Sequence, residues 1–212
     1  MEQPQDQPRR WQRRKDARPQ EILDAALAVF AEKGFAATRM DDIAARAGVT
    51  KGTIYLYFDS KEEVFKSLVR ESIGTTLSAV VASAGAFEGS ARALLEFVLG
   101  NVGRFVLTSD RVVLPKIILA EAGNFPELVC FYRGEIIEKG LTLLSSVFAR
   151  GIAQGEFRND VKPEHAARLA IAPVLLAALW RTTFAPLETE PYDLEGLIDA
   201  HLAVLLRGLE AK

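Results

Sequence analysis

Apolar residues in this chain recur with the spacing of an α-helix and do not alternate as they do in a β-strand. In the first such segment Ile22, Ala26, Val29 and Phe30 stand at i, i+4, i+7 and i+8, which places them on one face of a helix. Ala and Leu dominate elsewhere, and neither an Asn-Gly nor an Asp-Gly hairpin turn occurs. The pattern predicts an all-α fold.

Composition narrows the class of protein further. The 212 residues are 49% hydrophobic, which is enough for one large or two modest cores. Cys130, His165 and His201 provide neither a disulfide framework nor the clustered ligands of a zinc site. The longest apolar stretch, 169–180, is shorter than the roughly 20 residues that span a bilayer. We expect a cytoplasmic protein with no cofactor, no metal and no membrane segment, in which Cys130 is a buried thiol.

Glycines and capping residues divide the first part of the chain into short helices. The first helix is expected to begin near Pro19, which suits a first helical turn, and to end at Gly34. Thr38 and Asp41, three residues apart, resemble a capping box and predict a second helix that stops at Gly48. The apolar stripe of this second helix is Met40, Ile43, Ala44 and Ala47.

A third, shorter helix follows the turn at Gly48. Thr50 is a natural N-cap for a helix over residues 51–58, and Ser60 with Glu63 forms a second capping box that opens a fourth helix. Two short helices joined by a tight turn are what a helix-turn-helix requires, because the first braces the second in the major groove of DNA. The spacing therefore predicts a DNA-reading helix at 51–58.

The two faces of this third helix differ in chemistry. Ile54 and Phe58, at i and i+4, would pack inward, and Gly52 would let the backbone approach a ligand closely. The outer face carries charged, hydroxyl and aromatic groups that suit phosphate and base contacts: Lys51, Thr53, Tyr55 and Tyr57. On periodicity alone, a plain three-helix bundle in which the two tyrosines are packing residues is an equal alternative.

A resemblance to a known family bears on that alternative. Residues 22–68, above all the segments FAEKGF (30–35), DIA (42–44), AGVTKGTIYLYF (47–58) and SKEE (60–63), closely resemble the DNA-binding domain of tetracycline-repressor-like (TetR family) regulators. The resemblance implies a homodimeric repressor of about nine helices per subunit. It also implies a C-terminal body that binds a small molecule, which releases the protein from its operator.

Site residues follow from the matched positions of the motif. The resemblance implies these DNA contacts: Thr38, Arg39, Thr50, Lys51, Gly52, Thr53, Tyr55, Tyr57 and Lys61. Residues 115–132, with AEA at 120–122 and FPEL at 125–128, look like a C-terminal type found in some family members, including regulators of drug efflux.

Three domains are expected. Residues 1–17 form a flexible basic arm without the apolar core of a signal peptide, which either follows the DNA backbone or is a solvated tail. Residues 18–65 form the helix-turn-helix domain, and 66–212 form a ligand-binding and dimerisation domain joined to it through the fourth helix. Residues 1–70 hold 13 Lys/Arg and 11 Asp/Glu (net +2), against 13 and 17 (net −4) for the rest, which favours a DNA-facing N-terminal end.

The C-terminal domain should contain helices near 89–107, 111–122, 126–154, 163–184 and 193–209, separated by breaks rich in Gly, Pro, Ser or Asp. Aromatic residues on these helices are candidates for an apolar effector pocket, although most aromatic residues on such helices simply belong to the core: Phe105, Phe131, Phe148, Trp180 and Phe184. The family pattern pairs the last two helices with those of a partner subunit. An apolar stripe fits such an interface, with packing inside the chain as the alternative: Leu202, Leu205, Leu206 and Leu209.

The function expected from these features is that of a ligand-responsive transcriptional regulator, most simply a repressor. Its partners would be a palindromic double-stranded DNA operator, a small hydrophobic effector and a second copy of the chain. No nucleophile elbow, P-loop or dinucleotide fingerprint points to an enzyme. The remaining alternative is a helical binding protein without DNA function. The effector would act by shifting the fourth helix, which would change the spacing of two reading helices.

Overall fold

The computed structural model describes the backbone of residues 9–211 and the side chains of residues 19–211. Within these residues the chain is helical apart from its turns and one isolated antiparallel bridge between Phe157 and Glu210. The predicted all-α class is confirmed. The chain divides into two compact units between Leu68 and Val69, three residues beyond the expected boundary, and each unit is described by itself.

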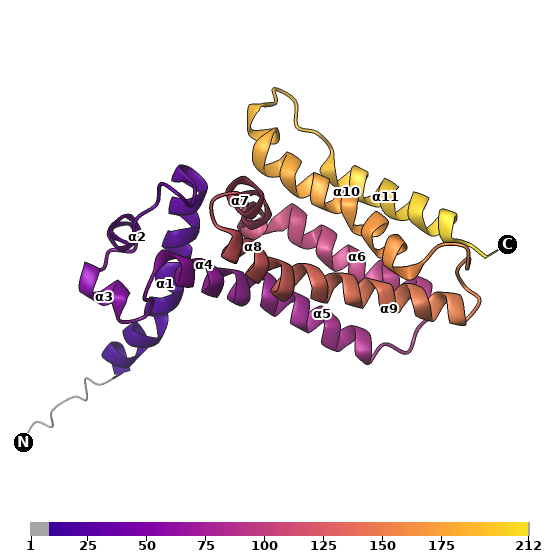
Figure 1. Cartoon of the computed structure of the whole chain (residues 1–212), viewed down its shortest axis with the longest axis horizontal. Coiled ribbons are helices and arrows are strands. Elements are labelled where there is room, and N and C mark those ends of the chain that lie inside the picture. The colour runs from indigo at the N-terminus through magenta and orange to yellow at the C-terminus, as the bar shows by residue number, and fades with distance from the viewer. Residues whose placement is uncertain (1–8, 212) are drawn as a thin grey trace, which may run out of the picture. The chain divides into compact units, whose positions relative to one another are not determined.

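The first unit contains the N-terminal helices of Figure 1: α1 (Arg9–Lys33), α2 (Met40–Arg46), α3 (Lys51–Tyr55) and α4 (Lys61–Val69), whose last residue already belongs to the second unit. The start predicted near Pro19 is wrong, because α1 begins ten residues earlier and Pro19 lies inside the helix. A proline at such a position removes one backbone donor, which makes it a natural but here misleading start signal. Apart from the helical backbone from Arg9 onward, the predicted basic arm lies outside the described residues.

Three phenylalanines form the centre of this unit. Phe30 of α1, Phe35 of the following turn and Phe65 of α4 are at most 1% exposed, and their ring centroids lie 5.3, 5.5 and 5.8 Å apart. Edge-on and tilted pairs at such distances stabilise a core by roughly 0.5–1.5 kcal/mol each beyond the burial of their area. The three rings therefore join the two longest helices of the unit.

Glycines end the first two helices, as predicted. Gly34 and Gly48 adopt positive φ values of 78° and 65°, a left-handed conformation that side chains with a Cβ rarely take. After Gly48 the chain turns back, and the Val49 N–H donates to the Ala44 carbonyl at 3.0 Å. This turn sets α3 against α2.

The second unit holds the remaining helices. In chain order they are η1 (Arg70–Gly74), α5 (Thr75–Gly85), α6 (Ala91–Thr108), η2 (Asp110–Val112), α7 (Val113–Glu121), α8 (Pro126–Tyr132), η3 (Arg133–Glu138), α9 (Lys139–Ala153), α10 (Pro163–Thr183), η4 (Ala185–Leu187) and α11 (Leu194–Leu209). The π-helical segments η1 and η3 join α4 to α5 and α8 to α9 without a break. The labelled helices of the described residues therefore amount to nine continuous segments, as predicted.

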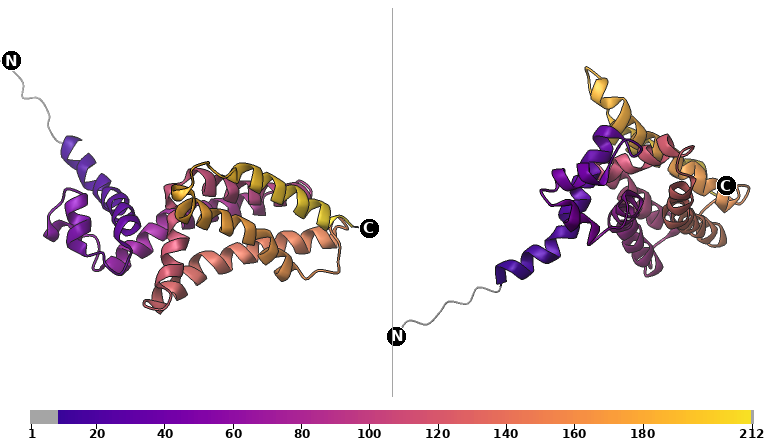
Figure 2. Two further views of the ribbon diagram at one scale, coloured as in Figure 1. Left: turned by 90° about the horizontal axis from the view of Figure 1, so that it is seen from above. Right: turned by 60° about the vertical axis from the view of Figure 1, so that its left-hand side comes forward.

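The core of the second unit lies between α5, α6, α9, α10 and α11. Leu95, Phe148, Ala167 and Leu206 are among its buried members. In Figures 1 and 2, α10 and α11 run side by side. Residues Pro163–Leu187, with a mean hydropathy of 1.4, are by length and composition apolar enough to cross a membrane. The alanine-rich face of α10 is packed in the core, and 22% of the apolar window is buried.

Candidate nucleic-acid interface and effector cavity

Helix α3 is held at its start by the two threonines of its first turn. Thr50 is the N-cap: its Oγ1 accepts from the Thr53 N–H at 3.2 Å, and the two hydroxyl oxygens lie 2.8 Å apart. The helix ends at Tyr55, earlier than the predicted Phe58, because the Leu56 and Tyr57 N–H groups bond three residues back and tighten the chain. Helix α3 is therefore less than two turns long.

The two predicted faces of α3 are present. Ile54 and Phe58 are buried, at 0% and 7% exposure, as expected. Lys51, Gly52 and Tyr55 are exposed, as is Thr50 before them, whereas Thr53 and Tyr57 are half-buried. One outward residue was missed: Leu56 is 80% exposed. In the sequence, an apolar leucine is typical of a core position. Only its place directly after Tyr55, on the outer face of the helix, could have indicated that it is exposed.

Lys51 forms an ion pair with Asp41 of α2. The ammonium lies 3.0 Å from a carboxylate oxygen, and this hydrogen bond raises the pKa of Lys51 above its usual value. Both side chains are more than half exposed, so the pair contributes little to stability. Lys51 is therefore available to an anionic partner that displaces Asp41.

Lys61, predicted to contact phosphate, is engaged inside the first unit. Its Nζ donates to the carbonyls of Phe35 at 2.9 Å, Ala36 at 3.0 Å and Thr38 at 3.2 Å. An ammonium has three donors, so all of them are occupied. In the structure Lys61 anchors the turn between α1 and α2, and its predicted phosphate contact would require it to leave these acceptors.

Thr38 is also turned inward. It is 2% exposed and its hydroxyl donates to the Gly34 carbonyl at 2.6 Å, so the predicted DNA contact by its side chain is wrong. The predicted cap at Thr38 is displaced by one residue, because the N-cap of α2 is the exposed Arg39. The Arg39 N–H donates to Asp42 Oδ2 at 2.9 Å, and Lys33 lies 2.7 Å from the other oxygen of that carboxylate.

The second unit contains an apolar cavity of about 470 Å³. Its wall is formed by α5 to α7, Tyr132 of α8, η3, the start of α9 and the middle of α10, with Ile73 of η1 also lining it and few polar residues. Leu119, Ile137 and Leu175 line it and are also 42–56% exposed, so the cavity opens to the surface past an apolar rim. Such a space suits a small apolar ligand.

Of the five aromatic residues predicted for a pocket, only Phe105 lines this cavity. Phe148 is 1% exposed in the core beside Phe157. The Phe131 ring faces the Arg70 guanidinium, 4.9 Å away. Trp180 and Phe184 pack together near the end of α10. Most residues of the cavity wall are aliphatic, and the sequence does not distinguish an aliphatic cavity residue from a core residue.

The leucines predicted for a dimer interface all contact the core of their own unit, to different extents. Leu206 and Leu209 are buried, which agrees with the alternative of packing within the chain, whereas Leu202 and Leu205 are half-buried against the same core. Apolar residues exposed on α10 and α11 lie elsewhere: Leu169 at 65%, Leu176 at 54% and Val204 at 71%. The burial of Cys130 was also wrongly predicted, because its side chain is exposed while Leu128 and Tyr132 form the buried face of α8.

Comparisons with known proteins agree with these two units. The family described as "Bacterial regulatory proteins, tetR family" matches residues 22–68, and the "Tetracyclin repressor-like, C-terminal domain" matches residues 84–200. The fatty acid metabolism regulator protein of Bacillus subtilis is 28% identical over 207 residues, covering 93% of this chain and all of that protein. The transcriptional repressor KstR2 of Rhodococcus jostii is 30% identical over 170 residues, covering 78% of this chain and 80% of the repressor.

A solved structure gives the same result. FadR from Bacillus subtilis, crystallised in complex with stearoyl-CoA, superposes with a TM-score of 0.73 at 25% identity over 90% of this chain and 99% of its own. These relatives are regulators and not enzymes, as predicted; the drug-efflux subtype stays a prediction. With both halves matched, this chain belongs to the tetR family of transcriptional regulators.

Proposed function

We propose that this chain is a repressor that binds a palindromic DNA operator in the cytoplasm as a homodimer and is released by a small hydrophobic effector. The observation that carries the DNA part is the outer face of α3, where Lys51, Gly52 and Tyr55 are exposed over the buried Ile54 and Phe58. Arg39, the N-cap of α2, is also part of the proposed surface. So are Thr50 before α3, Thr53 within it and Tyr57 after it. The exposed Leu56 is added as an apolar group suited to a thymine methyl.

The homodimer is proposed to form through the outer faces of α10 and α11. Leu169 and Leu176 stand seven residues apart on one face of α10, and Val204 stands on α11 beside the exposed Ala200 and Ala203. A second copy of the same two helices would cover these apolar groups. Two reading helices held in such a pair are what a palindromic operator requires, because its half-sites repeat about one helical turn apart.

The apolar cavity is the proposed effector site. Ile73 of η1 lines it, and η1 continues the helix of α4 with right-handed helical backbone at both Val69 and Thr75. An effector in the cavity therefore contacts the segment of chain that directly follows the DNA-binding unit. We propose that occupancy changes the spacing of the two reading helices in the dimer.

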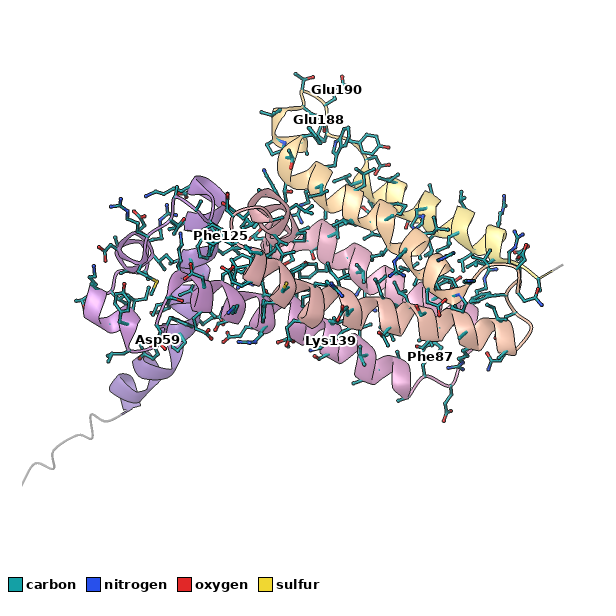
Figure 3. The ribbon with its side chains drawn as sticks, viewed as in Figure 1. Asp59, Phe87, Phe125, Lys139, Glu188 and Glu190 are labelled. Atoms are coloured by element: carbon teal, nitrogen blue, oxygen red, sulfur yellow. The ribbon has the colours of Figure 1, made fainter. Side chains whose placement is uncertain are left out.

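A mobility-shift titration with the palindromic DNA upstream of the chain's own gene tests this proposal. Lys51→Ala is expected to weaken binding, and the matched control is Lys139→Ala. Lys139, labelled in Figure 3, is also exposed and paired with a carboxylate, that of Glu135 at 2.6 Å, but it lies in the second unit. Absence of specific binding by the unaltered chain, or an equal effect of the two substitutions, would contradict the proposal.

A further inference from the structure

Tyr132 is a buried polar residue in the wall of the effector cavity. It is the last residue of α8, it is 6% exposed and it lines the cavity. Its hydroxyl has no hydrogen-bond partner within the described part of the chain, and burial raises the pKa of the phenol well above its usual value. The phenol therefore keeps its proton at neutral pH and can donate it in a hydrogen bond.

The fully buried, unpartnered side-chain atoms of the described residues do not include this hydroxyl, so it is open to a water molecule or a ligand. An apolar ligand that covered it without accepting its hydrogen bond would leave it unpaired, which is unfavourable. The other polar groups of the cavity wall already donate to the backbone. Asn101 Nδ2 donates to the Phe97 carbonyl at 2.7 Å, Thr76 Oγ1 to the Ser72 carbonyl at 3.1 Å, and Arg168 Nη1 to the Glu164 carbonyl at 2.9 Å. Tyr132 is the polar residue of the described wall whose side chain makes no hydrogen bond to the protein.

Charge around the cavity restricts the ligand as well. Arg168 is the charged residue of the described wall, and it is exposed; neither Asp nor Glu lines the cavity in the described chain. An organic cation would enter an apolar space with no carboxylate to pair with, which is costly. A pure hydrocarbon would leave the Tyr132 hydroxyl unpaired.

We infer that Tyr132 donates a hydrogen bond to a neutral oxygen of the effector, so that the effector is an apolar molecule bearing a carbonyl group. This inference rests on the proposed role of the cavity as the effector site. It makes Tyr132 a specificity-determining residue: its hydroxyl distinguishes a carbonyl compound from a hydrocarbon of the same shape, because only the carbonyl satisfies the buried donor.

Displacement of a neutral fluorescent dye, N-phenyl-1-naphthylamine, tests the inference on the full chain. The competitors are 2-decanone and 2-methyl-1-decene, which differ only in that a methylene group replaces the ketone oxygen. In Tyr132→Phe the inhibition constant of 2-decanone should rise by about fivefold to tenfold, as expected for one hydrogen bond. That of the alkene should stay the same. Tyr192→Phe, at a tyrosine that is 52% exposed and does not line the cavity, is the matched control.

Thermal unfolding of the ligand-free variant provides a second measurement. Tyr132→Phe removes an unpartnered hydroxyl, so the midpoint should stay the same or rise. A lowered midpoint would show that the hydroxyl has a structural partner and would overturn the inference. So would equal displacement by 2-decanone in Tyr132→Phe and the unaltered chain.

The same experiments distinguish failure of this inference from failure of the proposed function. If the dye does not bind to the unaltered chain, the cavity is not a ligand site, and this inference fails while DNA binding stands. If 2-decanone binds through Tyr132 but leaves the operator complex intact, release by the effector is contradicted and the assignment of Tyr132 stands.

Discussion

Lys61 and Phe35 contact each other twice, although they are 26 residues apart in the chain. The Lys61 ammonium donates to the Phe35 carbonyl at 2.9 Å and lies 4.7 Å from the centroid of the Phe35 ring. The ring belongs to the aromatic centre of the first unit, and the carbonyl belongs to the turn before α2. One side chain of α4 thus secures the turn that positions the helix-turn-helix.

Replacing Lys61 is therefore expected to act on stability. Lys61→Met leaves three backbone carbonyls without their donor and should lower the free energy of unfolding by about 1–3 kcal/mol, measured by urea denaturation. The slope of log affinity for DNA against log salt concentration should stay the same, since no phosphate contact is lost. A slope reduced by about one, with stability unchanged, would restore Lys61 as a phosphate contact.

Lys51 and Asp41 should have opposite effects on DNA affinity. Lys51→Ala is expected to weaken binding to all sequences alike and to reduce the salt slope by about one. Asp41→Asn removes the carboxylate that competes with phosphate for Lys51 and should strengthen binding. Fluorescence anisotropy at several salt concentrations measures both. Weaker binding by Asp41→Asn would mean that Asp41 positions Lys51 and does not compete with DNA.

The apolar faces of α11 should respond differently to substitution. Val204→Glu, at an exposed position, should give monomers in sedimentation velocity and leave the helical content intact. Leu206→Ala, at a buried position, should destabilise the fold by about 2–5 kcal/mol. Val81→Glu, at an exposed apolar position on α5, is the control for added charge. A dimer that persists in Val204→Glu would place the interface elsewhere.

Glu156 should make the stability of the second unit depend on pH. Its carboxylate accepts from the Ala91 and Arg92 N–H groups, both at 3.0 Å, at the start of α6, and these bonds lower its pKa below the usual 4.5. A lowered folded-state pKa means that the stabilisation is complete above the unfolded pKa and is lost as the pH falls through the folded one. The unfolding midpoint should therefore fall in acid below about pH 4.5.

Substitution separates this group from the other carboxylates. In Glu156→Gln the midpoint should be lower at neutral pH and should lose part of its decline in acid. Glu190→Gln, at an exposed residue of the loop before α11, should keep the full decline. Identical acid profiles for the unaltered chain and Glu156→Gln would contradict the assignment.

Sequence alone determined the features that depend on neighbours in the chain. Helical periodicity predicted the all-α class, Gly34 and Gly48 marked the helix ends because positive φ suits glycine, and the spacing of Ile54 and Phe58 identified the buried face of α3. The family resemblance at residues 47–58 identified the class of regulator. Each of these signals is local, so no distant contact was needed to interpret it.

Only the tertiary structure decided what depends on distant partners. Lys61 occurs in a matched motif, yet its three acceptors lie more than twenty residues earlier, so its inward role became visible only in the fold. Leu206 and Val204 are two residues apart on one helix, and an apolar side chain does not specify which neighbour covers it. The role inferred for Tyr132 also depends on the fold, because the residue lines a cavity formed by separate helices and has no hydrogen-bond partner among the described residues.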